Sequence, residues 1–342
     1  MTQGEAPREL HVRSERWPLS RPFRISRGVK TAAEVIVVEL REGEAVGRGE
    51  SVPYSRYGES IDSVMNQIES LRTALRQGLS RQQLLNVLSA GAARNAVDCA
   101  LWDLEAQISG AGVADAPGGA VVEPFTTALT ISLDTPEAMG TAGREVAGWP
   151  LVKVKVDAVN PAGQIRSVRE ACPTSTLIVD PNESWNADML RELEPVLIEA
   201  RIALIEQPLP AGSEHELDGL RSAIPLCADE SCHTVEDLAG LVGRFQFINI
   251  KLDKTGGLTA ALDLLDRARQ LKFGIMVGCM ICTSLSIAPA MRVARHARFV
   301  DLDGPLWLSR DRAGGVAVER QRLRAPQAGF WGERHAVGPY MK

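Results

Sequence analysis

Ionisable side chains recur along this chain at intervals of 22 to 26 residues, each at the end of a short apolar segment. The segments LVKVK, TLIVD, IALIE, IPLCAD and FINIK end at Lys155, Asp180, Glu206, Asp229 and Lys251. Stretches of helical pattern separate them, for example residues 188–199 and 260–271. A strand followed by a crossover helix, repeated in this way, is typical of a parallel barrel, in which functional groups lie at the carboxyl ends of the strands. We therefore expect five ionisable groups to converge on one mouth.

Eight strand-like segments follow residue 120, which is the number that a closed barrel needs. They are residues 125–131, 151–156, 176–180, 203–206, 225–229, 247–251, 273–278 and 298–303. We predict an α/β barrel, a modified TIM-type barrel with seven or eight βα units, over residues 121–305.

Upstream of the barrel, the order of elements is typical of an α+β domain. Residues 34–40 and 45–50 are predicted as strands, and residues 61–77, 81–89 and 92–108 as helices. An Ala/Gly/Pro-rich stretch, residues 111–124, is predicted as a linker. We expect residues 1–120 to form a capping domain, on which residues 306–342 pack back.

The composition argues against several classes of protein. A net charge of −5 over 342 residues, without a run of Lys or Arg, argues against a nucleic-acid partner. No segment approaches ~18 consecutive apolar residues, and the first residues form no apolar signal segment, so we expect no membrane association and a cytoplasmic location. Six cysteines in that setting indicate free thiols, with Cys279 and Cys282 lining a pocket. A homo-oligomer is possible, since it is the common state of soluble enzymes.

Three carboxylates end successive strands and are predicted to bind a metal. Asp180, Glu206 and Asp229 should point into one space above the barrel. Three hard oxygen ligands without Cys or His suit Mg²⁺, or Mn²⁺, better than Zn²⁺. A helix N-cap would explain Asp180 or Asp229 alone. It explains less well three carboxylates in register with two lysines, because clustered anions need a cation.

The lysines suggest proton transfer. Lys153 and Lys155 lie two residues apart on one strand and share a face, while Val152 and Val154 alternate with them. Barrel interiors are normally filled by Val, Ile and Leu, and a buried lysine needs a partner. Lys251 ends a strand four positions further on, so it should lie across the barrel from Lys155. Two bases on opposite sides of a bound substrate can invert a carbon centre.

These residues lie within motifs that resemble the enolase superfamily, muconate-lactonizing subgroup. The motifs are K-x-K (153–155), D-x-N-E-S-W (180–185), E-Q-P-L-P (206–210), A-D-E-S (228–231), N-I-K-L-D-K-T-G-G-L (249–258), P-Y-x-R-Y-G-E-S (53–60) and residues 91–104. The resemblance covers nearly the whole chain. It implies catalytic roles for Lys155 and Lys251, metal ligation by the three carboxylates, and supporting roles for Lys153, Asn182 and Asn249.

A further motif, D-L-D-G-P at 301–305, bears on the substrate. It resembles the D-x-D with which dipeptide epimerases hold the α-ammonium of a dipeptide. Two carboxylates on one strand face suit a cationic group, whereas a turn or cap would explain only one of Asp301 and Asp303. The resemblance thus implies Mg²⁺-dependent epimerisation of a dipeptide at the α-carbon of its carboxy-terminal residue. The expected substrate is L-Ala-D/L-Glu, and two lysines would exchange the α-proton through an enediolate.

An acidic second side chain on the substrate would need a cation from the capping loops. Arg24, Arg27, Lys30 and Arg56 are candidates, although each alone is equally well explained as a solvated surface charge. Thr130, in the first barrel strand, is a further candidate for substrate contact. Such an epimerase would fit the turnover of murein peptides.

Two alternatives remain open at this point. One is an o-succinylbenzoate synthase or muconate cycloisomerase of the same subgroup, whose substrates carry no ammonium. The other is a non-catalytic, metal-dependent ligand-binding protein. The presence of both lysines argues against the second, because binding alone needs neither base.

Overall fold

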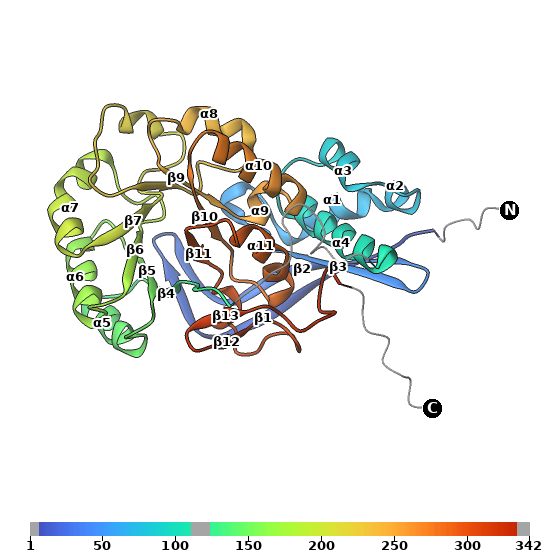
Figure 1. Ribbon diagram of the computed structural model, residues 1–342, viewed down its shortest axis with the longest axis horizontal. Helices are drawn as coiled ribbons and strands as arrows, with labels where there is room; N and C mark the ends of the chain where they lie inside the picture. Colours follow the sequence, from blue (N-terminus) through green and yellow to red (C-terminus); the bar gives the residue numbers. More distant parts are fainter. Residues whose placement is uncertain (1–6, 111–123, 334–342) are drawn as a thin grey trace.

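A computed structural model of the chain describes residues 7–110 and 124–333 (Figure 1). The first part is an antiparallel sheet of three strands in the order β1-β2-β3, covered by helices. Its elements are β1 (Glu9–Ile25), β2 (Gly28–Glu42), β3 (Ala45–Ser51), α1 (Ile61–Ser70), α2 (Arg72–Arg76), α3 (Arg81–Val87) and α4 (Ala92–Ser109). Alternate residues of β2, such as Ile36 and Val38, share one core with the Ala- and Leu-rich face of α4.

Two elements of this capping domain differ from expectation. Strand β1 is absent from the prediction, because Ser14 and Arg16 interrupt the apolar alternation that Leu10 and Val12 begin, and Pro18 falls within the strand. It is an edge strand, where proline is tolerated, and its pairing with β2 shifts register between Pro18 and Phe23. The predicted helix 61–77 is divided at Leu71 into α1 and α2. The predicted linker lies almost wholly outside the described residues.

The second part is a nearly closed parallel barrel, which confirms the predicted fold class. Its sheet runs in the order β11-β10-β9-β8-β7-β6-β5-β4. The strands are β4 (Leu129–Ile131), β5 (Leu151–Lys155), β6 (Thr176–Asp180), β7 (Ile202–Glu206), β8 (Leu226–Ala228), β9 (Phe247–Ile250), β10 (Gly274–Gly278) and β11 (Phe299–Asp301). Between β11 and β4 the seam is joined, among the described residues, by three hydrogen bonds: from Ala128 N to Val300 O at 2.7 Å, from Leu302 N to Thr127 Oγ1 at 2.8 Å and from Thr130 N to Asp303 Oδ2 at 2.8 Å.

Helices surround the barrel, as Figure 1 shows for α5 to α7 on its outer side. They are α5 (Pro136–Glu145), α6 (Pro161–Ala171), α7 (Ala187–Glu199), α8 (Leu238–Leu241), α9 (Leu252–Thr255), α10 (Leu258–Gln270) and α11 (Ser284–Ala294). Single-turn helices occupy Ser55–Tyr57, Glu214–Leu217, Val235–Asp237 and Gly304–Trp307. No helix among the described residues is long and apolar enough to cross a membrane.

One apolar layer fills the amino-terminal end of the barrel. Each strand, or the residue just before it, contributes one side chain to this layer: Ala128, Leu151, Ile178, Leu204, Cys227, Phe247, Met276 and Phe299. Because side chains alternate along a strand, residues two positions further on also point inward, at the next level up. At that level the chain places Lys153, Asp180, Glu206, Asp229 and Asp301. The polar centre therefore rests directly on a closed apolar floor.

The described part of the carboxy-terminal segment runs back across the capping sheet. Leu308 pairs with Leu19 of β1, and the indole of Trp331 donates to Arg48 O at 2.9 Å. A short hairpin of β12 (Ala317–Glu319) and β13 (Arg322–Arg324) also pairs with Phe125, just before the barrel. The segment thus contacts both parts of the molecule.

Candidate active site

The barrel strands bring the predicted residues together at one mouth. Lys155 and Asp180 are paired in the register of β5 and β6, Glu206 ends β7, and Asp229 and Lys251 directly follow β8 and β9. All five are buried. They lie at the carboxyl end of the barrel, where the loops after the strands and the capping loops meet.

Each predicted base forms an ion pair with a predicted metal ligand. Lys155 Nζ lies 2.6 Å from Asp180 Oδ2, and Lys251 Nζ lies 2.6 Å from Asp229 Oδ2. Lys153 is central: its Nζ lies 2.7 Å from Glu206 and 3.0 Å from Asp180. The two lysines proposed as bases come from strands four positions apart in the sheet.

The charges of this cluster are strongly coupled. Burial opposes ionisation of Asp180, but Lys155 and Lys153 outweigh it and lower its pKa to about 2. Burial and the nearby Asp180 raise the pKa of Glu206 to about 7 in spite of Lys153. Burial alone would lower the pKa of Lys251, yet Asp229 and Glu206 raise it well above its ordinary value. The crowded carboxylates therefore favour additional positive charge.

The same carboxylates fit a hard divalent cation by their chemistry. Among residues 7–110 and 124–333, no three His, Cys, Asp or Glu side chains already have the spacing of a formed metal site. Even so, Glu206 Oε2 and Asp229 Oδ1 are buried and accept no hydrogen bond, although each lies 2.7 Å from a lysine ammonium. Carboxylate oxygens of this kind, without sulfur or nitrogen ligands, suit Mg²⁺ or Mn²⁺.

Amide side chains orient the charged groups. Asn182 Oδ1 accepts a hydrogen bond from Lys155 Nζ at 2.9 Å, and Asn249 Nδ2 donates to Glu206 Oε1 at 2.9 Å. Each amide therefore fixes one member of the cluster.

A fourth lysine, Lys254, is absent from the predicted site. Its ammonium is buried and lies 2.7 Å from Asp229 Oδ1, donates to Asn249 O at 2.9 Å, and also bonds to Asp229 O. Its position three residues after Lys251, on the same turn, is a signal that could have indicated it. Lys254 holds Asp229 from the side opposite Lys251.

A cavity of about 380 Å³ opens above this cluster. Its floor includes Lys153, Lys155 and Lys251, and its walls include Thr130, the loop Cys279–Ile281 and the capping loops around residues 23–30 and 54–57. Cys279 and Cys282 are free thiols, and of the two only Cys279 lines the cavity. The cavity thus lies between the barrel and the capping domain.

The two aspartates of the D-x-D motif line one side of the cavity. Asp301 Oδ2 lies 2.8 Å from Lys153 Nζ, while its other oxygen is buried and accepts no hydrogen bond. Asp303 Oδ2 accepts from Thr130 N at 2.8 Å and from the indole of Trp307 at 3.1 Å. Burial and Asp301 together raise the pKa of Asp303 to about 6. This wall can accept hydrogen bonds from a cationic or N–H group.

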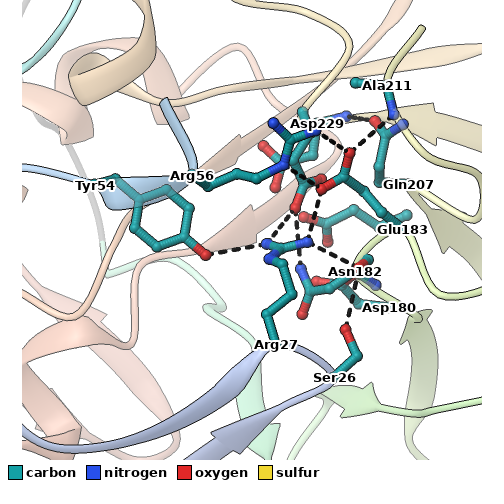
Figure 2. Close-up of polar contacts among 12 residues, drawn as sticks. Ser26, Arg27, Tyr54, Arg56, Asp180, Asn182, Glu183, Gln207, Ala211 and Asp229 are labelled. Atoms are coloured by element: carbon teal, nitrogen blue, oxygen red, sulfur yellow. Dashed lines mark hydrogen bonds and ion pairs between the residues drawn. The ribbon is translucent and has the colours of Figure 1, made fainter. Parts of the chain in front are cut away.

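The predicted capping cations differ in whether they line the cavity and in which groups they bind. Arg24 is half exposed, lies 4.0 Å from Asp134 and does not line the cavity, so its position does not support the predicted contact with substrate. Arg56 lines the cavity, but the Nε–Nη2 edge of its guanidinium is occupied by the Glu183 carboxylate, at 2.9 and 2.7 Å (Figure 2). Lys30 also lines the cavity, 5.1 Å above the ring of Tyr54, and burial lowers its pKa.

Lys30 is therefore the capping cation best placed to meet a ligand. No carboxylate oxygen of the described residues lies within 4.0 Å of its ammonium. Arg27, by contrast, is bound to two carboxylates of the barrel, Glu183 and Glu230. Neither of these two acids belongs to the predicted site, although both directly follow predicted residues, Asn182 and Asp229.

Comparison with known proteins matches both parts of the chain to one family. The mandelate racemase / muconate lactonizing enzyme N-terminal domain matches residues 7–118, and the enolase C-terminal domain-like family matches residues 138–330. An L-Ala-D/L-Glu epimerase of Escherichia coli (strain K12) is 47% identical over 306 residues, which cover 89% of this chain and 95% of that protein. An N-acetyl-D-glutamate racemase of Pseudoalteromonas sp is 45% identical over 304 residues, which cover 88% and 96%.

A solved structure is similarly close. It is an enolase family member from Agrobacterium tumefaciens with homology to dipeptide epimerases, with bound sodium and L-Ala-L-Glu and an ordered loop. The TM-score is 0.93 at 47% identity, and the match covers 95% of this chain and 100% of that one.

Proposed function

The chain belongs to the enolase superfamily, in its mandelate racemase and muconate lactonizing branch, and is an isomerase; on this premise we propose that it epimerises L-Ala-D/L-Glu. The observation that carries this proposal is the set of groups around one cavity. Two lysines face it from strands four positions apart, and two aspartates form a wall beside them. Such a set suits removal of a proton from one face of a carbon and its return to the other.

The residues of the chain divide the reaction between them. Lys155 and Lys251 would act in turn: one takes the α-proton and the other delivers a proton to the opposite face, which inverts the centre. Asp180, Glu206 and Asp229 would hold Mg²⁺, which when bound offsets the negative charge that develops on the substrate carboxylate. Both bases must first leave their ion pairs with Asp180 and Asp229. A cation between these carboxylates would favour that exchange.

Binding of the two ends of the dipeptide follows from the walls of the cavity. Asp301 and Asp303 would accept hydrogen bonds from the α-ammonium, since one oxygen of Asp301 is buried without a partner. Lys30 would pair with the γ-carboxylate of the glutamate residue. A cavity of about 380 Å³ is in the range for a small-molecule ligand.

A second candidate substrate is N-acetylglutamate, which has an acetyl amide in place of the ammonium. It is favoured by the pairing of Asp301 with Lys153, which reduces the negative charge available to an ammonium. The same wall could instead accept the N–H of an amide. The relative from Pseudoalteromonas sp makes this candidate worth testing directly.

Proton NMR in D₂O, with Mg²⁺ and enzyme, tests both substrates. L-Ala-L-Glu and L-Ala-D-Glu are followed at the α-proton of the glutamate residue, with N-acetyl-L-glutamate and N-acetyl-D-glutamate alongside. Loss of the α-proton signal together with appearance of the other diastereomer is expected for the dipeptides. Exchange confined to the N-acetyl compounds would replace the first candidate with the second. Lys155→Met and Lys251→Met should each abolish exchange of the α-proton of one epimer and retain that of the other; exchange of both epimers in either variant would overturn the two-lysine mechanism.

A further inference from the structure

Arg27 joins the capping domain to the barrel directly above the candidate bases. It lies in the tight connection between β1 and β2, and its guanidinium reaches four groups outside that connection (Figure 2). Nη2 lies 2.7 Å from Glu230 Oε1 and donates to the Tyr54 hydroxyl at 3.0 Å. Nη1 lies 2.9 Å from Glu183 Oε2 and donates to the backbone oxygen of Asn182 at 2.8 Å. A side chain engaged in this way is not available to hold a substrate.

The turn that Arg27 holds has an unusual backbone. Asn182 and Glu183 have φ values of 46° and 70°, in the left-handed region that residues other than glycine seldom adopt. Two hydrogen bonds to Asn182 O, from Arg27 and from Ser26 Oγ at 3.1 Å, come from the capping domain. Backbone strain of this kind persists only where surrounding contacts enforce it. The capping loop supplies part of that enforcement.

This turn positions a group that touches a predicted base. Asn182 Oδ1 accepts from Lys155 Nζ at 2.9 Å, and Asn182 N donates to Asp180 Oδ1 at 2.8 Å. A change in the Asn182 backbone would therefore move the amide oxygen away from Lys155. By contrast, Lys251 is bound to Asp229; among the described residues the turn bonds to the neighbouring Glu230, through Asn182 Nδ2 at 3.4 Å, and makes no hydrogen bond to Asp229 itself.

We propose that Arg27 is a positioning residue for Lys155: the docked capping loop holds the 181–183 turn so that Asn182 orients this one lysine. The inference rests on the proposed function, in which Lys155 and Lys251 serve opposite faces of the substrate. Arg27 would act on one half of the reaction only. The α-proton of one epimer is exchanged through Lys155, and that of the other epimer through Lys251.

Arg56 offers a matched control. It also comes from the capping domain and binds Glu183 through two hydrogen bonds, at 2.9 and 2.7 Å (Figure 2). It makes no hydrogen bond to Asn182 among the contacts of the described residues. Loss of Arg56 should loosen the contact between the two parts without releasing the backbone of Asn182.

The first measurement compares α-proton exchange out of each epimer in D₂O for Arg27→Met and Arg56→Met. In Arg27→Met we expect the ratio of the two exchange rates to shift at least about tenfold, the rate equivalent of one hydrogen bond to a charged group. The slower epimer should be the one that Lys155→Met silences. In Arg56→Met both rates should fall by a similar factor. A symmetric loss in Arg27→Met would overturn the inference, since it would show that Arg27 only closes the loop.

The second measurement does not depend on activity. Amide hydrogen exchange of residues 182–185 should be faster in Arg27→Met than in Arg56→Met, because Glu183 N donates to Gln207 O at 2.9 Å only while the turn keeps its shape. Equal protection in both variants and the wild type would overturn the positioning role. If the wild type exchanges no α-proton of any substrate, the proposed function fails, while the amide data still decide whether Arg27 holds the turn.

Discussion

Four buried lysines lie at the mouth of this barrel, and their partners distinguish their roles. Lys153, Lys155 and Lys251 line the cavity, where a ligand can replace their contacts. Lys254 is not among the lining residues and bonds two backbone oxygens as well as Asp229. These backbone bonds indicate a structural lysine that fixes the Asp229 carboxylate.

Lys254→Met should lower the free energy of unfolding by about 3 kcal/mol, because it leaves Asp229 Oδ1 and two buried backbone oxygens without a donor, although Lys251 still pairs with Asp229 Oδ2. Urea-induced unfolding measures this loss. Arg191→Met is the control: Arg191 forms an exposed pair with Asp188, worth roughly 0.5 kcal/mol. Equal losses in the two variants would contradict a structural role for Lys254. Weaker Mg²⁺ binding by Lys254→Met, followed by titration calorimetry, would further support its hold on Asp229.

The capping cations differ enough in position to be tested against each other. Lys30→Met should lower kcat/KM for L-Ala-L-Glu by about 10- to 100-fold, the range for a lost hydrogen bond between charged groups. The effect should be much smaller for L-Ala-L-Met, which has no γ-carboxylate. Arg24→Met should change neither value, because Arg24 lies outside the cavity. Steady-state kinetics that place the loss in Arg24→Met instead would contradict this assignment.

The sequence pattern is sufficient to identify the site residues at the strand ends. It does not indicate which cation of the capping domain faces the cavity. Lys155, Asp180 and Glu206 are placed by a period of two within short strands, so their convergence follows from the fold class. Arg24 and Lys30 lie at the adjoining ends of β1 and β2, and Arg56 lies in the single-turn helix Ser55–Tyr57; how these segments are placed over the barrel depends on tertiary contacts. Which of them faces the cavity is decided by partners such as Glu183, which are distant in sequence.

At the scale of elements, the capping sheet depends on how closely β3 approaches α4. A Cβ at Gly49 would lie 2.0 Å from Ala96 O, and one at Gly47 would lie 2.2 Å from Ala100 O. Both contacts are with helix backbone, which cannot rotate away. Glycine at these two positions lets the strand lie directly on the helix.

Gly49→Ala should therefore lower the free energy of unfolding by roughly 3 kcal/mol or more, through overpacking against α4. Gly240→Ala is the matched control, because nothing lies within 4 Å of a Cβ built there and the residue is helical. That variant should be neutral or more stable by up to about 1 kcal/mol. Thermal unfolding of the two variants measures the contrast. A Gly49→Ala protein as stable as wild type would show that β3 can move away from α4 at little cost.

Strand β1 shows the limit of pattern analysis for an element. Buried strands can be recognised from runs of apolar residues, such as TLIVD and FINIK. Strand β1 has no such run, because it lies at the sheet edge and most of its residues are at least partly exposed. Its pairing with β2 over many residues is a long-range property. The residues near its end, Phe23 and Ile25, line the cavity, so the missed strand also concealed part of the site.

At the scale of the whole molecule, carboxylates join the capping domain to the barrel. Asp253 of α9 accepts from Val52 N at 2.9 Å, Asp98 of α4 accepts from Thr259 N at 2.9 Å, and Glu50 of β3 accepts from Thr283 N at 2.8 Å. Each carboxylate belongs to one part and each N–H to the other. Burial raises the pKa of Asp253 to about 7 and that of Asp98 to about 6.

The contribution of Asp253 to the free energy of unfolding should decrease as pH rises from about 4 to about 7. Its pKa is about 7 in the native state and 3.8 as the ordinary value, so between these limits the native state keeps a proton that the unfolded chain has released. The difference in free energy of unfolding between wild type and Asp253→Asn should fall across this window by an amount on the order of 4 kcal/mol. Urea-induced unfolding at a series of pH values measures it, and a difference independent of pH would contradict the assignment.

The barrel seam between β4 and β11 is expected to contribute to substrate binding, whereas the lysines proposed to transfer protons lie at the ends of other strands. Thr130 and Asp303, which are hydrogen-bonded across the seam, belong to the wall expected to hold the amino end of the substrate, whereas Lys155 ends β5 and Lys251 follows β9, neither of which is a seam strand. Only one of the three hydrogen bonds across the seam joins two backbone groups, so mutations of Thr127 or Asp303 can reshape that wall without disturbing the strands that bear the lysines. In the descendants of such a gene we expect substitutions at the seam to change substrate specificity, while the two lysines and their proton-transfer chemistry are retained.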